Sequence, residues 1–328
     1  MKTSKTIITL IYFYRYKFIF KNMDNNCILY GTGAALITPF SEKGKIDFQN
    51  LEKLVSYTSK RGVSYLVLLG STAEPFSLKE EEKIDIINCI KSANGKNLPL
   101  ILGIGGNDPE NVIEQIYKTD LTVFECILSV SPYYNRPTQI GLYIHFKSIA
   151  KYTTSDIMIY NVPSRTGSNI LTETIVHLAN EFSNIVGVKE ASGNILQAYE
   201  IIKKKPENFS VISGDDSLAL PIILGGGDGA ISVIAQGFPK QFSDIIFLAK
   251  KNKPEKAFLL FYNIIEMIHL LFEEGNPTGI KALLKIIGIC ESNVRLPLVK
   301  ASLTLIEKIK IEYRNILVTK SIRKKLLL

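Results

Sequence analysis

The feature that most constrains the fold of this chain is an alternation of strand-like and helix-like segments that repeats eight times. Each unit has a short apolar or β-branched run, a loop with Gly, Ser, Thr or Pro, and an amphipathic stretch of helix length. The expected strands are 33–37, 65–69, 99–103, 126–130, 157–161, 185–189, 210–213 and 229–233, and helices are expected at 47–61, 79–93, 139–152 and 172–181. Such an alternation predicts a (β/α)8 TIM barrel.

A doubly wound open sheet is the alternative fold. No G-x-G-x-x-G opens the first unit, and residues 103–107 form only a loose glycine cluster. Strand signals stop after Pro254, and Leu/Ile-rich helical segments follow, broken at 275–277 and 296–297. We therefore expect an N-terminal extension at 1–30, a catalytic barrel at 31–252 and a C-terminal α-helical domain at 253–328, packed on the barrel or on a partner subunit.

The first 22 residues are treated separately. The aromatic-rich run at 7–20 is interrupted by Arg15 and Lys17 and is shorter than the ~20 residues that span a bilayer. No small-residue cleavage pattern follows it. A signal peptide and a membrane-surface segment stay open as alternatives, but we expect that Met23 is the true start and that no membrane is involved.

Composition excludes several other classes. With 328 residues, 46% of them hydrophobic, the chain can bury a large core. The net charge of +8 is spread along the chain without an aromatic-interleaved basic stripe, which favours mild attraction for anionic substrates and excludes nucleic-acid binding. Four distant cysteines and three histidines lack metal-binding spacing, so we expect reduced thiols in a cytoplasmic protein, with no metal and no cofactor.

Lys189 is the strongest candidate for chemistry. It ends the apolar run 186–188, where desolvation penalises an ammonium group, so it is a candidate Schiff-base nucleophile. A lysine on the surface just past a strand is the alternative. Tyr160 ends the preceding strand, and Arg165 lies in the loop after it. Because active sites of barrels lie where strands end, an amine, a phenol and a guanidinium could face one cavity.

Other strand ends add weaker candidates. Ser71 and Thr72 follow the second strand and suit a carboxylate or a proton transfer, although hydroxyls are routine in turns. Tyr133 and Tyr134 follow the fourth strand, where packing is the alternative role. Asp215 could cap a helix or contact an amino group. The glycine cluster at 225–229 precedes a strand, so we set phosphate binding aside.

Together these residues resemble a known family. GSTAE at 70–74, SPYYNRP at 131–137, YNVPSRTG at 160–167, VKEASGN at 188–194 and SGDD at 213–216 are similar to motifs of the dihydrodipicolinate synthase family. That family belongs to the pyruvate-dependent class I aldolases, which include N-acetylneuraminate lyase, and the resemblance runs from about residue 31 to about 299. It implies a lyase that condenses pyruvate with L-aspartate 4-semialdehyde to 4-hydroxy-tetrahydrodipicolinate, the first committed step of diaminopimelate and lysine biosynthesis.

The resemblance also implies roles for individual residues. Lys189 forms an imine with pyruvate, and Tyr160, Thr72 and Tyr134 form a proton relay, with Tyr134 supplied by a neighbouring subunit of a homotetramer built from two dimers. The substrate-binding residues implied are Ser71 and Thr72 for the pyruvate carboxylate, Arg165 for the carboxylate of the aldehyde substrate, Ile231 through its carbonyl, and Gly214 and Asp215 on the aldehyde side.

Departures from the family pattern are small. Serine at 71 replaces the usual threonine and keeps the hydroxyl, and Ala73 replaces glycine. Members acting on sialic acid generally lack a basic residue at the position of Arg165, which disfavours the alternative of an N-acetylneuraminate lyase type. A non-catalytic barrel scaffold is the alternative from another class.

The resemblance bears on regulation as well. Regulated members bind lysine at a dimer interface, where this chain has Pro75, Phe76, Lys83 in place of a histidine, and Asn111 in place of a glutamate. Tyr133 and Asn107 are retained, and Glu80 could compensate for the lost glutamate. We expect weak or no inhibition by lysine.

Overall fold

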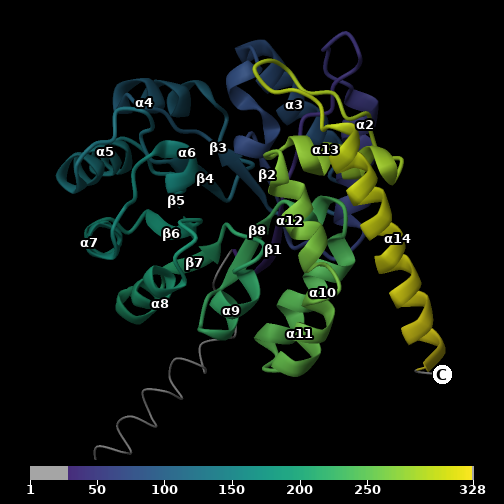
Figure 1. The fold of residues 1–328 in the computed structure, drawn as a ribbon. Coiled ribbons are helices and arrows are strands. Elements are labelled where there is room, and N and C mark those ends of the chain that lie inside the picture. Colours follow the sequence, from purple (N-terminus) through teal and green to yellow (C-terminus); the bar gives the residue numbers. More distant parts are fainter. Residues whose placement is uncertain (1–28, 327–328) are drawn as a thin grey trace, which may run out of the picture.

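The computed structural model describes residues 29–326, and their strands form one closed parallel barrel (Figure 1). Each strand pairs with its sequence neighbour, and β8 pairs with β1 to close the ring. The strands are β1 (Gly31–Ala35), β2 (Tyr65–Leu68), β3 (Leu100–Gly103), β4 (Cys126–Val130), β5 (Ile157–Asn161), β6 (Ile185–Glu190), β7 (Ser210–Ser213) and β8 (Gly229–Ser232). The predicted TIM barrel is confirmed, with strand boundaries within two residues of expectation. The expectation for residues 1–22 lies outside the described residues.

Helices follow the strands on the outside of the barrel. They are α2 (Phe48–Ser59), α3 (Glu80–Ala93), α4 (Pro109–Lys118), α5 (Gln139–Lys151), α6 (Pro163–Thr166), α7 (Thr172–Glu181), α8 (Ile195–Lys204), α9 (Ala219–Leu224) and α10 (Pro239–Lys250). Side-chain caps start several of them: Asp47 accepts a hydrogen bond from the Asn50 amide, and Thr138 accepts one from Gly141. Leu171 has no capping side chain, and its own N–H donates instead to the Gln139 side chain at 3.0 Å.

Alternation along the strands divides the core into two layers. One set of side chains fills the barrel and includes Tyr65, Ile101, Met158 and Ile231. Tyr160, near the carboxyl end of β5, belongs to the same set. The alternate residues of the strands pack against the surrounding helices in a larger cluster. Burial on both faces explains why the strands read as nearly continuous apolar runs.

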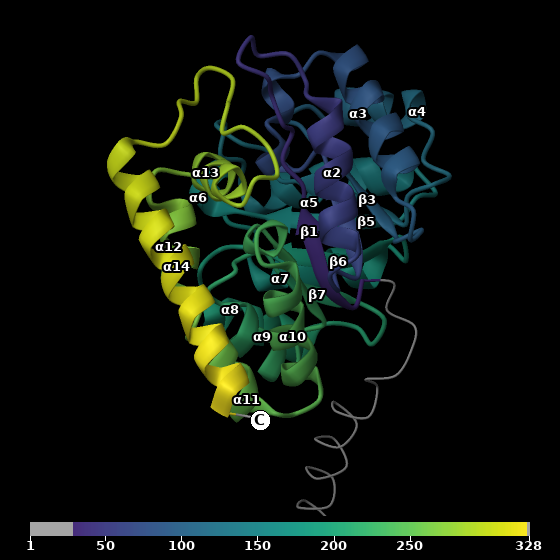
Figure 2. The same cartoon turned by 90° about the vertical axis from the view of Figure 1, so that its right-hand side faces the viewer.

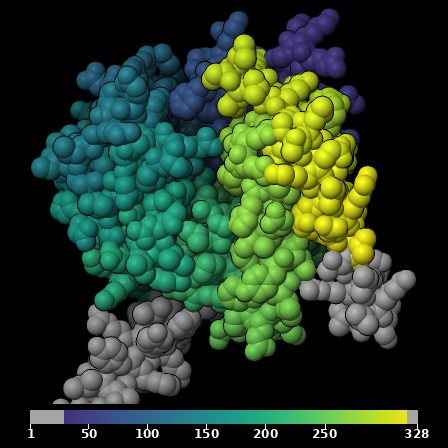
Figure 3. Space-filling model, in the orientation of Figure 1, coloured from purple at the N-terminus to yellow at the C-terminus, as the bar shows by residue number. Residues whose placement is uncertain are grey.

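The chain beyond the barrel is helical, as expected. The elements are α11 (Pro254–Phe261), α12 (Ile265–Glu273), α13 (Thr278–Ile286) and α14 (Leu303–Leu326). They cover one side of the barrel, with α14 along the outer edge (Figures 1 and 2). The space-filling view shows the same helices as a continuous green-to-yellow side of the molecule (Figure 3). Within the described residues, we find no helix with the length and apolar character needed to span a bilayer.

Candidate active site

Lys189 and Tyr160 form a buried pair at the carboxyl ends of two neighbouring strands. They are partners in the β5–β6 register, so their side chains leave the sheet side by side. Lys189 is 6% exposed, and its Nζ lies 4.1 Å from the centre of the Tyr160 ring. The structure therefore brings the predicted amine and phenol into contact.

The next residue of each strand stabilises the register of this pair. Asn161 pairs with Glu190, and the Asn161 Nδ2 donates to Glu190 Oε2 at 2.9 Å. The other Glu190 oxygen accepts from the Ser192 amide at 2.7 Å, and Gln197 donates to the carboxylate at 3.1 Å. Since a slip of one residue would turn both Lys189 and Tyr160 out of the barrel, this network supports the site.

Ser71 approaches the same phenol from the loop after β2. Residues Ser71–Ala73 form a single 3₁₀ turn, in which Thr72 is buried. Burial raises the pKa of the Tyr160 phenol, but the charge of Lys189 and a hydrogen bond with Ser71 outweigh it, and Arg165 adds to them. The pKa of Tyr160 is thus lowered, which makes the phenol a better proton donor.

Gly214 lies beside Lys189. A Cβ added to Gly214 would be 2.9 Å from Lys189 Cε and 2.7 Å from Ala191 Cβ, so only glycine allows the lysine stem to lie where it does. Ile231 is buried in β8 in register with Gly33.

The two aspartates after β7 have different surroundings. The Asp215 carboxylate accepts from the Ser217 amide at 2.8 Å, the Ser217 hydroxyl at 2.6 Å and the Leu218 amide at 3.3 Å, so it caps its own turn. Its contact with substrate stays a prediction. Asp216 is buried and accepts from the amides of Val233 and Ile234 at 3.0 and 2.8 Å, which fixes the turn after β8. Burial raises the Asp216 pKa to about 6.

Arg165 lies at the mouth of the site. It belongs to the short helix α6, is exposed, and donates from Nη2 to the backbone oxygen of Asn276 at 3.0 Å. A cavity of about 930 Å³ is lined by Ser71, Tyr160, Arg165 and Asn276, among others. Arg165 and Tyr160 therefore line one cavity, whereas Lys189 is not among the residues that line it.

Tyr134 is separate from this group. Its side chain is 89% exposed, and its backbone has a φ of 68° with the N–H donating to Thr166. It does not line the 930 Å³ cavity. A side chain that projects into solvent from the rim of a site is suited to reach a neighbouring molecule, as the resemblance implies.

Sequence reasoning missed the residues that hold the β2 loop. Glu74, at a left-handed φ of 57°, is 3% exposed in its side chain and forms an ion pair with Lys281, which is fully buried. Lys281 also donates to the Asn293 carbonyl at 2.8 Å, and the Arg295 amide donates to Glu74 at 2.9 Å. We call Glu74, Lys281 and Arg295 the loop staple. A glutamate at the end of a hydroxyl-rich loop was its only signal in the sequence.

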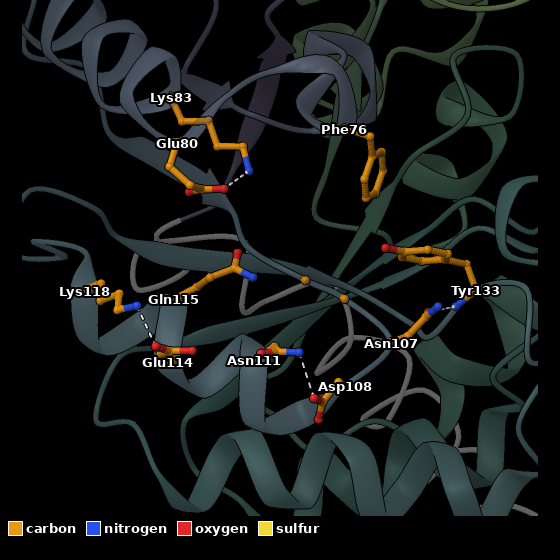
Figure 4. A pocket seen from close by; sticks show the side chains of 12 residues that line it. Phe76, Glu80, Lys83, Asn107, Asp108, Asn111, Glu114, Gln115, Lys118 and Tyr133 are labelled. Atoms are coloured by element: carbon orange, nitrogen blue, oxygen red, sulfur yellow. Dashed lines mark hydrogen bonds and ion pairs between the residues drawn. The ribbon is translucent and has the colours of Figure 1, made fainter. Parts of the chain in front are cut away.

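A second pocket, of about 560 Å³, is lined by the residues that the resemblance associates with lysine binding (Figure 4). It is lined by Phe76, Glu80, Lys83, Asn107, Asn111 and Tyr133, among others. Lys83 Nζ is 2.7 Å from Glu80 Oε1, and Asn111 donates to Asp108 at 2.8 Å. The Asn107 side chain accepts from the Tyr133 amide at 2.7 Å. The Glu80 carboxylate therefore already has the Lys83 ammonium as its partner.

Fold and site define a barrel protein with a buried lysine–tyrosine pair at the carboxyl ends of adjacent strands. Residues 16–315 match the Dihydrodipicolinate synthetase family, and the chain belongs to that family. The match extends beyond the 31–299 region in which the motifs lie.

Individual relatives agree with this assignment. A 4-hydroxy-tetrahydrodipicolinate synthase of Karelsulcia muelleri is 55% identical over 88% of this chain and 98% of its own length. One of Flavobacterium psychrophilum is 48% identical over 83% and 93%. The crystal structure of dihydrodipicolinate synthase from Thermotoga maritima matches with a TM-score of 0.85 and 34% identity, covering 88% of this chain and 99% of that one. A monomeric dihydrodipicolinate synthase variant matches with the same TM-score, at 34% identity over 88% and 97%.

Proposed function

We propose that this protein condenses pyruvate with L-aspartate 4-semialdehyde to 4-hydroxy-tetrahydrodipicolinate, in diaminopimelate and lysine biosynthesis. The observation that carries the proposal is the buried contact between Lys189 and Tyr160, 4.1 Å from nitrogen to ring centre. Family membership and the names of the close relatives support the choice of substrates.

The geometry suits a Schiff-base mechanism. The Lys189 amine adds to the ketone carbon of pyruvate and water leaves, giving an imine whose methyl group is acidic. Loss of a methyl proton gives an enamine, which bonds to the aldehyde carbon of the second substrate. The amine of that substrate then displaces Lys189 and closes the ring. Tyr160, with its lowered pKa, moves protons at the lysine nitrogen.

A coupled assay tests this function. Purified protein is mixed with pyruvate, aspartate semialdehyde and the reductase that consumes the product. As the product forms, the reductase is expected to oxidise its nicotinamide cofactor, and the rate of that oxidation is measured. N-acetylneuraminate in place of both substrates is expected to give no pyruvate. Release of pyruvate from N-acetylneuraminate, without condensation, would instead favour the lyase alternative.

Arg165→Ala is expected to raise the apparent KM for aspartate semialdehyde about thirtyfold, with little change in the KM for pyruvate. The reason is the loss of a charge-assisted contact with the carboxylate at the mouth, worth on the order of 2 kcal/mol. Arg314→Ala removes the same charge from the exposed face of α14 and serves as control. Equal changes in both KM values would indicate a structural role for Arg165.

We also propose that two chains share each site, within a homotetramer of two dimers. The exposure of Tyr134 supports this arrangement. Mixing inactive Lys189→Ala subunits with inactive Tyr134→Phe subunits is expected to restore activity, because a mixed dimer contains one complete site. Failure of recovery after verified subunit exchange, or full activity of a monomeric preparation, would refute the shared site.

Lysine is expected to inhibit weakly or not at all. The 560 Å³ pocket has Asn111 where a carboxylate would hold the ammonium, and the Lys83 cation lies in the same pocket. Loss of one charged hydrogen bond corresponds to roughly 1.5–3 kcal/mol, or about a tenfold to hundredfold weaker affinity. Initial rates under a lysine titration measure the effect. The double variant Lys83→His/Asn111→Glu is expected to gain inhibition, and half-inhibition of the unmodified enzyme below a millimolar would contradict this prediction.

A further inference from the structure

The segment between α12 and α13 places one side chain in the candidate site. Asn276 is 8% exposed, and its Nδ2 donates to Thr72 Oγ1 at 2.9 Å, across 204 positions of sequence. A threonine hydroxyl has one proton to donate and two lone pairs that accept. Because Asn276 occupies one lone pair with an N–H, the Thr72 proton is directed to another partner.

The two ends of the Asn276 amide differ in their hydrogen bonding, and within residues 29–326 only the N–H end has a partner. Among the described residues, its Oδ1 is buried and has no hydrogen-bond partner. A buried acceptor without a partner is destabilising, and such atoms are rare in folded proteins. The unsatisfied oxygen lies on the same side chain that donates to Thr72, so only the N–H end of this amide has a hydrogen-bond partner among the described residues.

The backbone of Asn276 makes a separate contact. Arg165 Nη2 donates to the Asn276 carbonyl oxygen at 3.0 Å. A change of the side chain leaves this carbonyl in place. Side-chain variants can therefore separate an effect on Thr72 from an effect on Arg165.

We infer that Asn276 is a positioning residue that sets the direction in which Thr72 donates its proton. With its amide N–H on one lone pair, the Thr72 hydroxyl donates to a partner in the proposed relay other than residue 276 and accepts on its remaining lone pair. The inference rests on the proposed function, in which Thr72 belongs to the proton relay.

Asn276→Asp tests the direction of donation with little change of shape. A carboxylate only accepts, so Thr72 turns its proton toward residue 276, and kcat is expected to fall about a hundredfold, a typical contribution of general acid–base catalysis. Protonation restores a donor, so part of the loss is expected to be recovered as the pH is lowered. The KM for aspartate semialdehyde is expected to stay within about twofold, because the Arg165 contact is to the backbone.

A double-mutant cycle provides the second measurement. Asn276→Ala is expected to lower kcat about tenfold in the native background and to have little effect in a Thr72→Val background, since coupled residues are not additive. Wild-type kcat in Asn276→Asp overturns the inference, and so does a loss without recovery at low pH. If Asn276→Asp does not fold, the double-mutant cycle decides: additive losses of kcat from Asn276→Ala and Thr72→Val overturn the inference.

The proposed function is checked separately in the same samples. Wild-type protein with pyruvate and borohydride is expected to carry an adduct on Lys189. Absence of that adduct would reject the proposed function and, with it, the basis of the inference. An adduct and normal turnover, combined with unaffected Asn276 variants, would reject the inference alone.

Discussion

Replacing Lys189 by alanine is expected to lower kcat by roughly a thousandfold or more, because a covalent nucleophile cannot be replaced by another group in the site. The substitution also removes the 4.1 Å contact with the Tyr160 ring, which no longer has a charged partner there. Steady-state rates in the coupled assay measure the loss. Thermal unfolding of the variant checks that the barrel itself remains intact.

Borohydride trapping locates the nucleophile directly. With pyruvate present, reduction is expected to add a three-carbon adduct to Lys189 and to inactivate the enzyme. Lys250 is a suitable control, because it too is buried, with its Nζ 4.9 Å from the ring centre of Tyr30. An adduct on Lys250 or on any other lysine, in place of Lys189, would show that the assignment is wrong.

Replacing Lys281 by methionine is expected to lower the free energy of unfolding by about 3–5 kcal/mol. The change leaves the Glu74 carboxylate buried without its cation, and breaking a buried pair costs far more than breaking an exposed one. Chemical denaturation followed by circular dichroism gives the value. Loss of the loop staple is also expected to lower activity, because Glu74 ends the loop that carries Ser71 and Thr72.

Lys285→Met on the same helix is the matched control. Lys285 forms an ion pair with Glu291 at 2.6 Å, but both side chains are about half exposed, so the expected cost is about 1 kcal/mol or less. The double variant Glu74→Gln/Lys281→Met, which removes both charges, is expected to regain part of the lost stability. Equal effects of Lys281→Met and Lys285→Met would mean that the buried pair is not a staple.

The strands could be predicted because their signal is local. Each buried strand is a short apolar run that ends in glycine or polar residues. Because active sites of such barrels lie at the carboxyl ends of the strands, Lys189, Tyr160 and Arg165 could be predicted to lie at one face of the barrel. The prediction needed only the residues of each unit. The contact of Tyr160 with Lys189 follows from neighbouring strands in parallel register.

Contacts between distant segments could not be predicted in this way. Asn276 meets Thr72 across 204 positions, and Lys281 meets Glu74 across 207. In the sequence, Asn276 was only part of a break between helices. Asp215 shows a further limit, since an aspartate that caps its own turn and one that contacts a substrate look alike in sequence.

The loop staple has a consequence for synthesis of the protein. Thr72 and Glu74 leave the ribosome long before Asn276, Lys281 and Arg295, and at roughly 5–20 residues per second the interval lasts tens of seconds or less. During that time β1 also lacks β8, its partner in the closed ring. An unpaired strand edge can recruit other chains. Nascent chains are therefore expected to depend on chaperones until β8 and the helices that carry Asn276 and Lys281 have emerged.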